Sequence, residues 1–249
     1  MTMTPPELVA HRGYTRHYPE NTIVGIEAAI RAGARFVEVD VQLTRDGVPV
    51  LFHDRSLARI CGAEGAVHDY DFEVLRRLRA SDFGRFGYKF AQVHIAALAE
   101  LRALLLEYPG VTAFVELKRE SIERFGENTV LGRVLQELKP VQRQCVLISY
   151  ALETLVAARA QWPTVGAVID RWRERRQPIV HALRPEYLFC DVDGLPRFGK
   201  LRYPGAKLIV YEVADPRRAL KLARRGVDFI ETFAFGELRA EIELLSQAP

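Results

Sequence analysis

Cysteine is scarce in this sequence. Its 249 residues include only three cysteines: Cys61, Cys145 and Cys190. Their number is odd, their spacings are wide and no two form a CxxC pair, so the sequence predicts neither a disulfide framework nor a zinc knuckle. We therefore expect the protein to work in a reducing compartment.

Long apolar runs are also missing. The most apolar helical stretch, residues 95–106, is interrupted by Glu100 and Arg102 and is too short to span a bilayer. Residues 1–7 contain two prolines and lack the apolar segment that a signal peptide needs. We expect a cytoplasmic protein with no integral membrane segment.

A large excess of positive or negative charge is also missing. The chain has 35 Lys and Arg against 32 Asp and Glu, a formal net charge of +3. The densest basic run, residues 171–176, is typical of a solvated helix or loop face. Because no stripe of basic and aromatic residues is visible, we do not expect a nucleic-acid partner. A mild positive field still favours a small anionic substrate.

Short apolar runs alternate with helical patterns along the whole chain. The expected strands cover residues 8–10, 36–43, 48–52, 112–117, 146–149, 166–169, 187–190, 208–210 and 229–231. Repeated βα units in about 250 residues predict a (β/α)₈ TIM barrel formed by residues 1–249 as a single domain. A doubly wound open sheet is the alternative.

Nine strands are one more than a barrel needs. We assign the excess to a boundary error or to a hairpin through Asp46-Gly47, a dipeptide typical of tight turns. Residues 55–93 show no clear strand and are expected to form a short insertion after the third strand, with a helix near residues 72–78.

Two carboxylates stand on one expected strand with one residue between them. Because alternate strand residues share a face, Glu38 and Asp40 point the same way. Two adjacent carboxylates repel each other unless a cation or proton intervenes. A hard divalent cation with oxygen ligands fits this pattern, and pairing with nearby arginines is the alternative.

Glu116 and Lys118 repeat the alternation at the end of the fourth expected strand. Glu116 offers a third carboxylate, and Lys118 aims an ammonium group at the same end of the barrel. A simple Glu–Lys pair is the alternative. In this fold the carboxyl ends of the strands form the active site.

Two histidines follow apolar strands in the same neighbourhood. His11 follows the first strand and His53 the third. A two-residue turn at Asp46-Gly47 would pair Arg45 with Val48 and place His53 across from Asp40. A lone histidine is more often structural, but a pair beside carboxylates favours proton transfer, because the ordinary pKa of imidazole lies near neutrality.

These residues occur in a series of motifs whose order and spacing resemble the glycerophosphodiester phosphodiesterase family. The motifs are Ala10-His11-Arg12-Gly13, Pro19-Glu20-Asn21-Thr22, Glu38-Val39-Asp40-Val41, Thr44-Arg45-Asp46-Gly47, Val50-Leu51-Phe52-His53-Asp54 and Glu116-Leu117-Lys118. The second half of the chain is similar to the family more loosely, at Ser149-Tyr150, Val210-Tyr211 and Gly226-Val227-Asp228.

The resemblance implies a (β/α)₈ barrel that cleaves glycerophosphodiesters to glycerol 3-phosphate and an alcohol. It implies a divalent cation, Mg²⁺ or Ca²⁺, at three carboxylates: Glu38, Asp40 and Glu116. It further implies that His11 and His53 act as general acid and base. Arg12 and Lys118 are implied to bind the phosphate of a small phosphodiester substrate.

Three segments depart from the family pattern: Ala96-Ala97-Leu98-Ala99, Tyr211-Glu212-Val213-Ala214 and Thr232-Phe233. Ala214 and Phe233 replace hydrogen-bonding groups, which predicts a preference for a substrate with an apolar substituent, unless Phe233 turns inward. The alternatives are therefore a lysophospholipase D-like phosphodiesterase and a non-catalytic barrel that binds a phosphorylated ligand. Two proton-transfer groups favour catalysis over mere binding.

Overall fold

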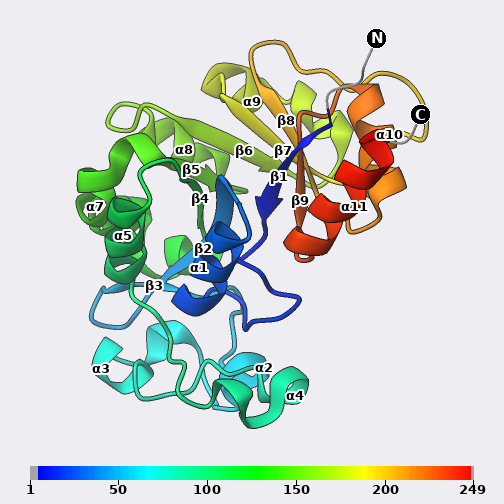
Figure 1. Ribbon diagram of the computed structural model, residues 1–249. Coiled ribbons are helices and arrows are strands. Elements are labelled where there is room, and N and C mark those ends of the chain that lie inside the picture. The colour runs from blue at the N-terminus through cyan, green and yellow to red at the C-terminus, as the bar shows by residue number, and fades with distance from the viewer. Residues whose placement is uncertain (1–4, 248–249) are drawn as a thin grey trace.

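The computed structural model describes residues 5–247 and shows a closed barrel of parallel strands surrounded by helices (Figure 1). The barrel order is β1-β2-β4-β5-β6-β7-β8-β9, and β9 closes onto β1. These strands are β1 (Glu7–Ala10), β2 (Phe36–Leu43), β4 (Thr112–Leu117), β5 (Cys145–Ser149), β6 (Val165–Ile169), β7 (Tyr187–Asp191), β8 (Lys207–Tyr211) and β9 (Phe229–Thr232). The predicted (β/α)₈ fold is confirmed, and an open sheet is excluded.

The strand beyond the eight of the barrel is β3 (Pro49–Leu51). It forms an antiparallel hairpin with β2 and lies outside the barrel order. The predicted register was wrong by one residue, because the turn holds three residues rather than two. Thr44 N donates to Val48 O at 3.0 Å, and Gly47 adopts φ +79°, which is unfavourable for residues with a side chain. Phe52, not His53, therefore lies across from Asp40 and donates its N–H to the Asp40 carbonyl.

Strand alternation divides the apolar side chains between two cores. Val37, Val39 and Val41 are buried outside the barrel, in the large core beneath the helices. Val9 and Phe114 belong to a separate cluster inside the barrel. The surrounding helices are α1 (Ile23–Arg31), α5 (Leu98–Glu107), α6 (Arg119–Phe125), α7 (Glu127–Leu138), α8 (Leu152–Ala158), α9 (Pro178–Leu183), α10 (Pro216–Arg225) and α11 (Phe235–Gln247).

Helix α1 shows how local sequence sets an element that positions the site. Thr22 caps its first turn by accepting from Gly25 N at 3.3 Å, and Ile26 and Ile30 bury its apolar face. The helix ends at Arg31, and Gly33, just past the cap residue Ala32, has φ +97°, which matches the left-handed residue that commonly follows a helix. The Thr22 cap thereby fixes the point at which the loop between β1 and α1 joins the helix.

The expected insertion after the third strand is present as a lobe at one end of the barrel (Figure 1, in cyan and teal). Its short helices are α2 (Ala58–Cys61), α3 (Phe72–Leu75) and α4 (Phe83–Phe86), with 3₁₀ turns at Val67–Asp69 and Gly87–Phe90. The helix expected near residues 72–78 is thus shorter than predicted. A small apolar cluster that includes Leu57, Ile60 and Leu75 holds the lobe together.

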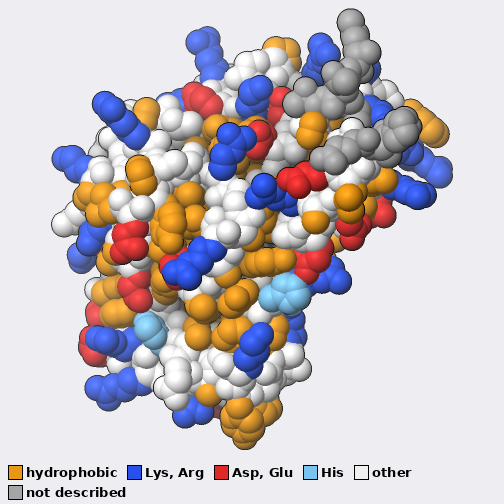
Figure 2. All heavy atoms as spheres, viewed as in Figure 1, with side chains coloured by type: hydrophobic (Ala, Val, Ile, Leu, Met, Phe, Trp, Pro, Cys, Tyr) orange, Lys and Arg blue, Asp and Glu red, His pale blue; other side chains and the backbone are white. Residues whose placement is uncertain are grey.

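The surface carries no single dominant charge on the face drawn in Figure 2, where acidic and basic side chains are interspersed. Apolar side chains gather at the tip of the insertion in this view, and the exposed large apolar residues of the insertion are Val74, Phe83 and Tyr88. In residues 5–247, no helix is both long enough and apolar enough to cross a membrane.

Candidate active site

The predicted site residues converge at the carboxyl ends of the barrel strands. His11, Arg12, Glu38, His53, Glu116 and Lys118 line one cavity of about 80 Å³, which we call the bore cavity. Its volume suits an ion with one or two waters better than a whole diester. A larger hollow of about 900 Å³ lies at the opposite end of the barrel, where Tyr187 and Lys207 begin their strands, and it contains none of the predicted site residues.

The chain turn after β1 places His11 and Arg12 at the cavity. Gly13 has φ +88°, and a Cβ atom there would lie 2.8 Å from the carbonyl carbon of Gly25 in α1. Only glycine lets the backbone pass so close to the helix. Gly13 is therefore a structural requirement of the turn that carries His11 and Arg12.

Asp40 is the most completely paired carboxylate of the site. It is 1% exposed, and Arg12 Nε lies 3.1 Å from Oδ2, Lys118 Nζ 3.2 Å from Oδ1 and Asn21 Nδ2 2.9 Å from Oδ2. Burial alone would raise the pKa of the Asp40 carboxyl, but the cationic groups of Arg12 and Lys118 hold it well below its usual range. Asp40 therefore stays ionised.

Glu116 lies beside Asp40, since these two residues are register partners in β2 and β4. Lys118 Nζ donates to Glu116 Oε1 at 3.0 Å, so the Glu–Lys pair considered from the sequence is present. Of the arginine pairs considered for Glu38 and Asp40, the one between Arg12 and Asp40 is present. Burial, and then the charge of Asp40, raise the pKa of Glu116. Lys118 alone does not neutralise both carboxylates.

Glu38 supplies the observation that favours a cation. Its Oε2 accepts from Arg12 N at 3.2 Å, whereas its buried Oε1 has no hydrogen-bond partner among the described residues. Burial and the neighbouring carboxylates of Asp40 and Glu231 raise the pKa of Glu38 well above its usual range. One oxygen each of Glu38, Asp40 and Glu116 lies within 4.8 Å of the others. This oxygen-only set fits Mg²⁺ or Ca²⁺.

The two histidines each contact a carboxylate through Nδ1. His11 Nδ1 contacts Glu212, and His11 Nε2 lies 3.7 Å from Glu38 Oε2. Burial alone would lower the pKa of His11, but the carboxylates of Glu231 and Glu212 outweigh it and raise that pKa.

His53 Nδ1 lies 2.8 Å from Asp54 Oδ1. The loop that carries His53 is anchored by Gln42, whose Nε2 donates to the carbonyls of Phe52, His53 and Asp54 at 3.0, 3.1 and 2.8 Å. The hairpin therefore delivers His53 to the bore cavity despite the shifted register.

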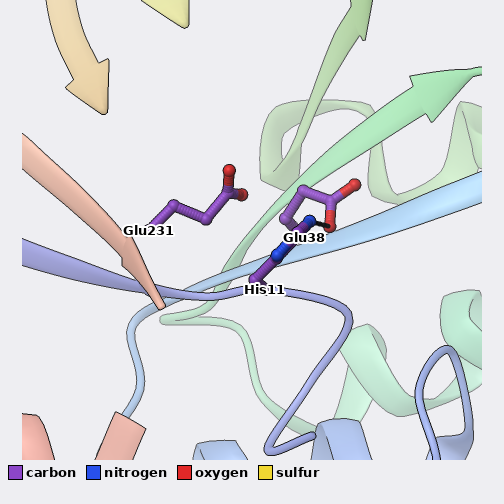
Figure 3. A group of neighbouring side chains, drawn as sticks. All are labelled: His11, Glu38 and Glu231. Atoms are coloured by element: carbon purple, nitrogen blue, oxygen red, sulfur yellow. Dashed lines mark ion pairs between the residues drawn. The ribbon is translucent and has the colours of Figure 1, made fainter. Parts of the chain in front are cut away.

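Sequence reasoning missed two carboxylates, Glu231 and Glu212. Glu231 on β9 is 3% exposed and faces the bore cavity (Figure 3). Glu231 could have been found from the sequence, because it is a charged residue in the apolar strand segment Phe229-Ile230-Glu231, as Glu38 is in its own strand. Glu212 comes after β8, where strand alternation no longer indicates direction. The departure at 211–214 thus adds a charged group, and Phe233 does not line the bore cavity.

Comparison with known proteins identifies the group to which this architecture belongs. A model of the Glycerophosphoryl diester phosphodiesterase family matches residues 11–232. The chain belongs to this family. The matched range contains every predicted site residue as well as Glu212 and Glu231.

Individual relatives agree with the family assignment. A glycerophosphodiester phosphodiesterase of Caldanaerobacter subterraneus subsp. tengcongensis is 41% identical over 234 residues, which are 90% of this chain and 93% of that protein. Bovine glycerophosphodiester phosphodiesterase 1 is 31% identical over 192 residues, or 76% of this chain, which spans about half (53%) of the bovine protein.

Among solved structures, a phosphodiesterase of Oleispira antarctica in complex with the product sn-glycerol-3-phosphate superposes with a TM-score of 0.81. It is 25% identical to this chain, and the match covers 96% of this chain and 97% of the Oleispira chain. The similarity therefore extends over the whole barrel rather than over the strand ends alone.

Proposed function

We propose that this chain hydrolyses glycerophosphodiesters to glycerol 3-phosphate and an alcohol, with a divalent cation and two histidines. The observation that carries the proposal is the convergence of His11 and His53 on one cavity with the carboxylates of Glu38 and Glu116. The names of the relatives and the product bound to the Oleispira enzyme support the same substrate class.

The charge of the site suits a phosphodiester monoanion. A cation bound at Glu38, Asp40 and Glu116 would supply Lewis-acid stabilisation of the charge that grows on the phosphoryl oxygens. Burial alone would lower the pKa of Arg12, but Asp40 and Glu20 raise it above its ordinary value, and Lys118 is likewise stabilised as a cation by Asp40 and Glu116. Both groups therefore stay charged and are available to bind phosphate at the edge of the bore cavity.

The two histidines supply proton transfer. One removes a proton from the attacking water, and the other protonates the departing alkoxide. If a hydroxyl group of the substrate attacks first, water then opens the resulting cyclic phosphate with the two roles exchanged. Contact of Nδ1 with Glu212 in His11, and with Asp54 in His53, leaves Nε2 of each ring for this exchange. A barrel that only binds a phosphorylated ligand would not need two imidazoles oriented in this way.

A panel of diesters tests the proposal. With Mg²⁺ or Ca²⁺ present, we expect glycerophosphocholine and glycerophosphoethanolamine to release glycerol 3-phosphate, measured by an enzyme-coupled assay. Absence of turnover of any diester would overturn the proposal. The apolar preference suggested by Phe233 stays a prediction: a higher kcat/KM for short-chain lysophosphatidylcholine below its micellar concentration, reversed in Phe233→Asp, would support the lysophospholipase D-like alternative.

Glu212 is expected to act as a positioning residue for His11. Replacement by Gln removes a charge-assisted hydrogen bond of about 1.5–3 kcal/mol, so kcat should fall roughly 10- to 100-fold while KM changes little. Glu212→Asp should restore part of the loss. Glu153→Gln, at an exposed position on α8, is the matched control. A kcat for Glu212→Gln equal to that of the control would remove Glu212 from the mechanism.

A further inference from the structure

Glu231 is a buried carboxylate that the proposed mechanism does not use. It projects from β9 into the barrel beside His11 (Figure 3), and its Oε1 has no hydrogen-bond partner among the described residues. A buried carboxylate without a partner is costly whether it is ionised or protonated, because its desolvation is not compensated. A compensating ligand is therefore expected at this oxygen.

The neighbours of Glu231 form a second set of potential metal ligands. One atom each of His11, Glu38 and Glu231 lies within 4.8 Å of the others. The three side chains come from the end of β1, from β2 and from β9 and point toward a common space (Figure 3). Glu38 belongs to this set and to the oxygen-only set, and its Oε1 is also buried and unpartnered.

The lysine and arginine side chains of the site form ion pairs with carboxylates other than Glu231. Arg12 pairs with Asp40 and Glu20, and Lys118 pairs with Asp40 and Glu116. Neither makes an ion pair with Glu231 in the described structure. Burial raises the pKa of Glu231, and among the described residues the charge of His11, followed by that of Arg12, acts against that rise.

The environment of His11 is typical of a metal-bound imidazole. A ligating histidine almost always donates its other ring N–H to a carboxylate or carbonyl, which fixes the tautomer and the ring orientation. Glu212 contacts Nδ1 of His11 in this way, and Nε2 is directed toward Glu38. Zn²⁺ accepts an imidazole nitrogen together with carboxylate oxygens, whereas Mg²⁺ and Ca²⁺ favour oxygen alone.

We propose that His11, Glu38 and Glu231 form a second cation site, selective for Zn²⁺ over Mg²⁺, beside the oxygen-only site. Zn²⁺ at this position occupies Nε2 of His11, so the ring can no longer transfer a proton. Zn²⁺ is therefore an inhibitor of the Mg²⁺-supported reaction. The inhibition rests on the proposed function, whereas the binding does not.

Calorimetric titration of the whole chain with Zn²⁺, in excess Mg²⁺, tests the site directly. We expect one Zn²⁺ per chain for the wild type. Glu212→Gln should weaken Zn²⁺ binding by about 10- to 100-fold, the usual effect of losing a carboxylate behind a ligating histidine. Glu231→Gln and His11→Ala each remove a ligand and should weaken it at least as much. Thermal melts confirm that each variant is folded.

Asp40→Asn is the matched control, because Asp40 belongs only to the oxygen-only set. It should keep the Zn²⁺ affinity of the wild type. Equal affinity in wild type and Glu231→Gln would overturn the proposal, as would loss of Zn²⁺ binding in Asp40→Asn alone, which would place Zn²⁺ in the oxygen-only site. Absence of Zn²⁺ binding by the wild type would likewise overturn the proposal.

Enzyme kinetics then tests the consequence. The fractional inhibition by Zn²⁺, relative to each variant's own rate, should follow the calorimetric affinity and be lost in Glu231→Gln. Zn²⁺ that binds as predicted without inhibiting would overturn the inhibitory role. If no diester is hydrolysed at all, the proposed function fails, but the calorimetry still decides the existence of the site.

Discussion

Replacement of either His11 or His53 by alanine is expected to lower kcat by about 10²- to 10⁴-fold, the contribution of a general acid or base. Both imidazoles line the bore cavity, and each contacts a carboxylate through Nδ1. Neither ring belongs to the apolar cores, so loss of either should leave the barrel folded.

Steady-state kinetics on glycerophosphocholine, with circular dichroism as the check on folding, measures this effect. The pH profile of kcat/KM should be bell-shaped in the wild type and lose one limb in each variant. His94→Ala is the matched control, because His94 is exposed and contacts Glu100 outside the cavity. A near-normal rate in either variant excludes that histidine from proton transfer.

Removal of divalent cations should abolish turnover, and Mg²⁺ or Ca²⁺ should restore it. The reason is the negative charge of three neighbouring carboxylates, Glu38, Asp40 and Glu116. Lys118 and Arg12 supply too little positive charge to balance it. Glu116→Gln keeps the shape of the side chain and removes one ligand charge. Glu116→Gln should raise the Mg²⁺ concentration for half-maximal activity by at least about tenfold. Loss of a residue that merely supports a metal ligand already weakens metal binding about 10-fold or more, and Glu116 is expected to be a ligand itself.

The control for Glu116→Gln is again Glu153→Gln, whose Mg²⁺ dependence should match the wild type. Calorimetric titration with Mg²⁺ gives a second measurement that is independent of turnover. Full activity after exhaustive chelation would refute the metal assignment, and an unchanged Mg²⁺ affinity in Glu116→Gln would remove Glu116 from the ligand set.

Most of the barrel was predictable because buried parallel strands have a strong local signature. Phe36–Leu43 and Thr112–Leu117 were bounded correctly from apolar runs alone. Alternation within those runs also placed Glu38, Asp40 and Glu116 on one face, because every second residue of a strand points to the same side of the sheet. The position of His53 was less secure, because a one-residue change in the turn at Thr44 shifts the whole register.

Contacts between distant parts of the chain lay beyond such reasoning. Glu212 reaches His11 across 201 positions of sequence, from a segment where no regular period sets the direction of the side chain. The path of the insertion was likewise hidden, because its helices are single turns without an apolar period. Glu231 differs from Glu212 and from the insertion, because the strand alternation that identified Glu38 also identifies Glu231.

The most direct test of the account is identification of the phosphate product from glycerophosphocholine by ³¹P NMR, with and without Mg²⁺. We expect the diester resonance to be replaced by that of glycerol 3-phosphate when Mg²⁺ is present and to persist when the cation has been removed. Formation of phosphocholine in place of glycerol 3-phosphate, or equal turnover with and without the cation, would contradict it.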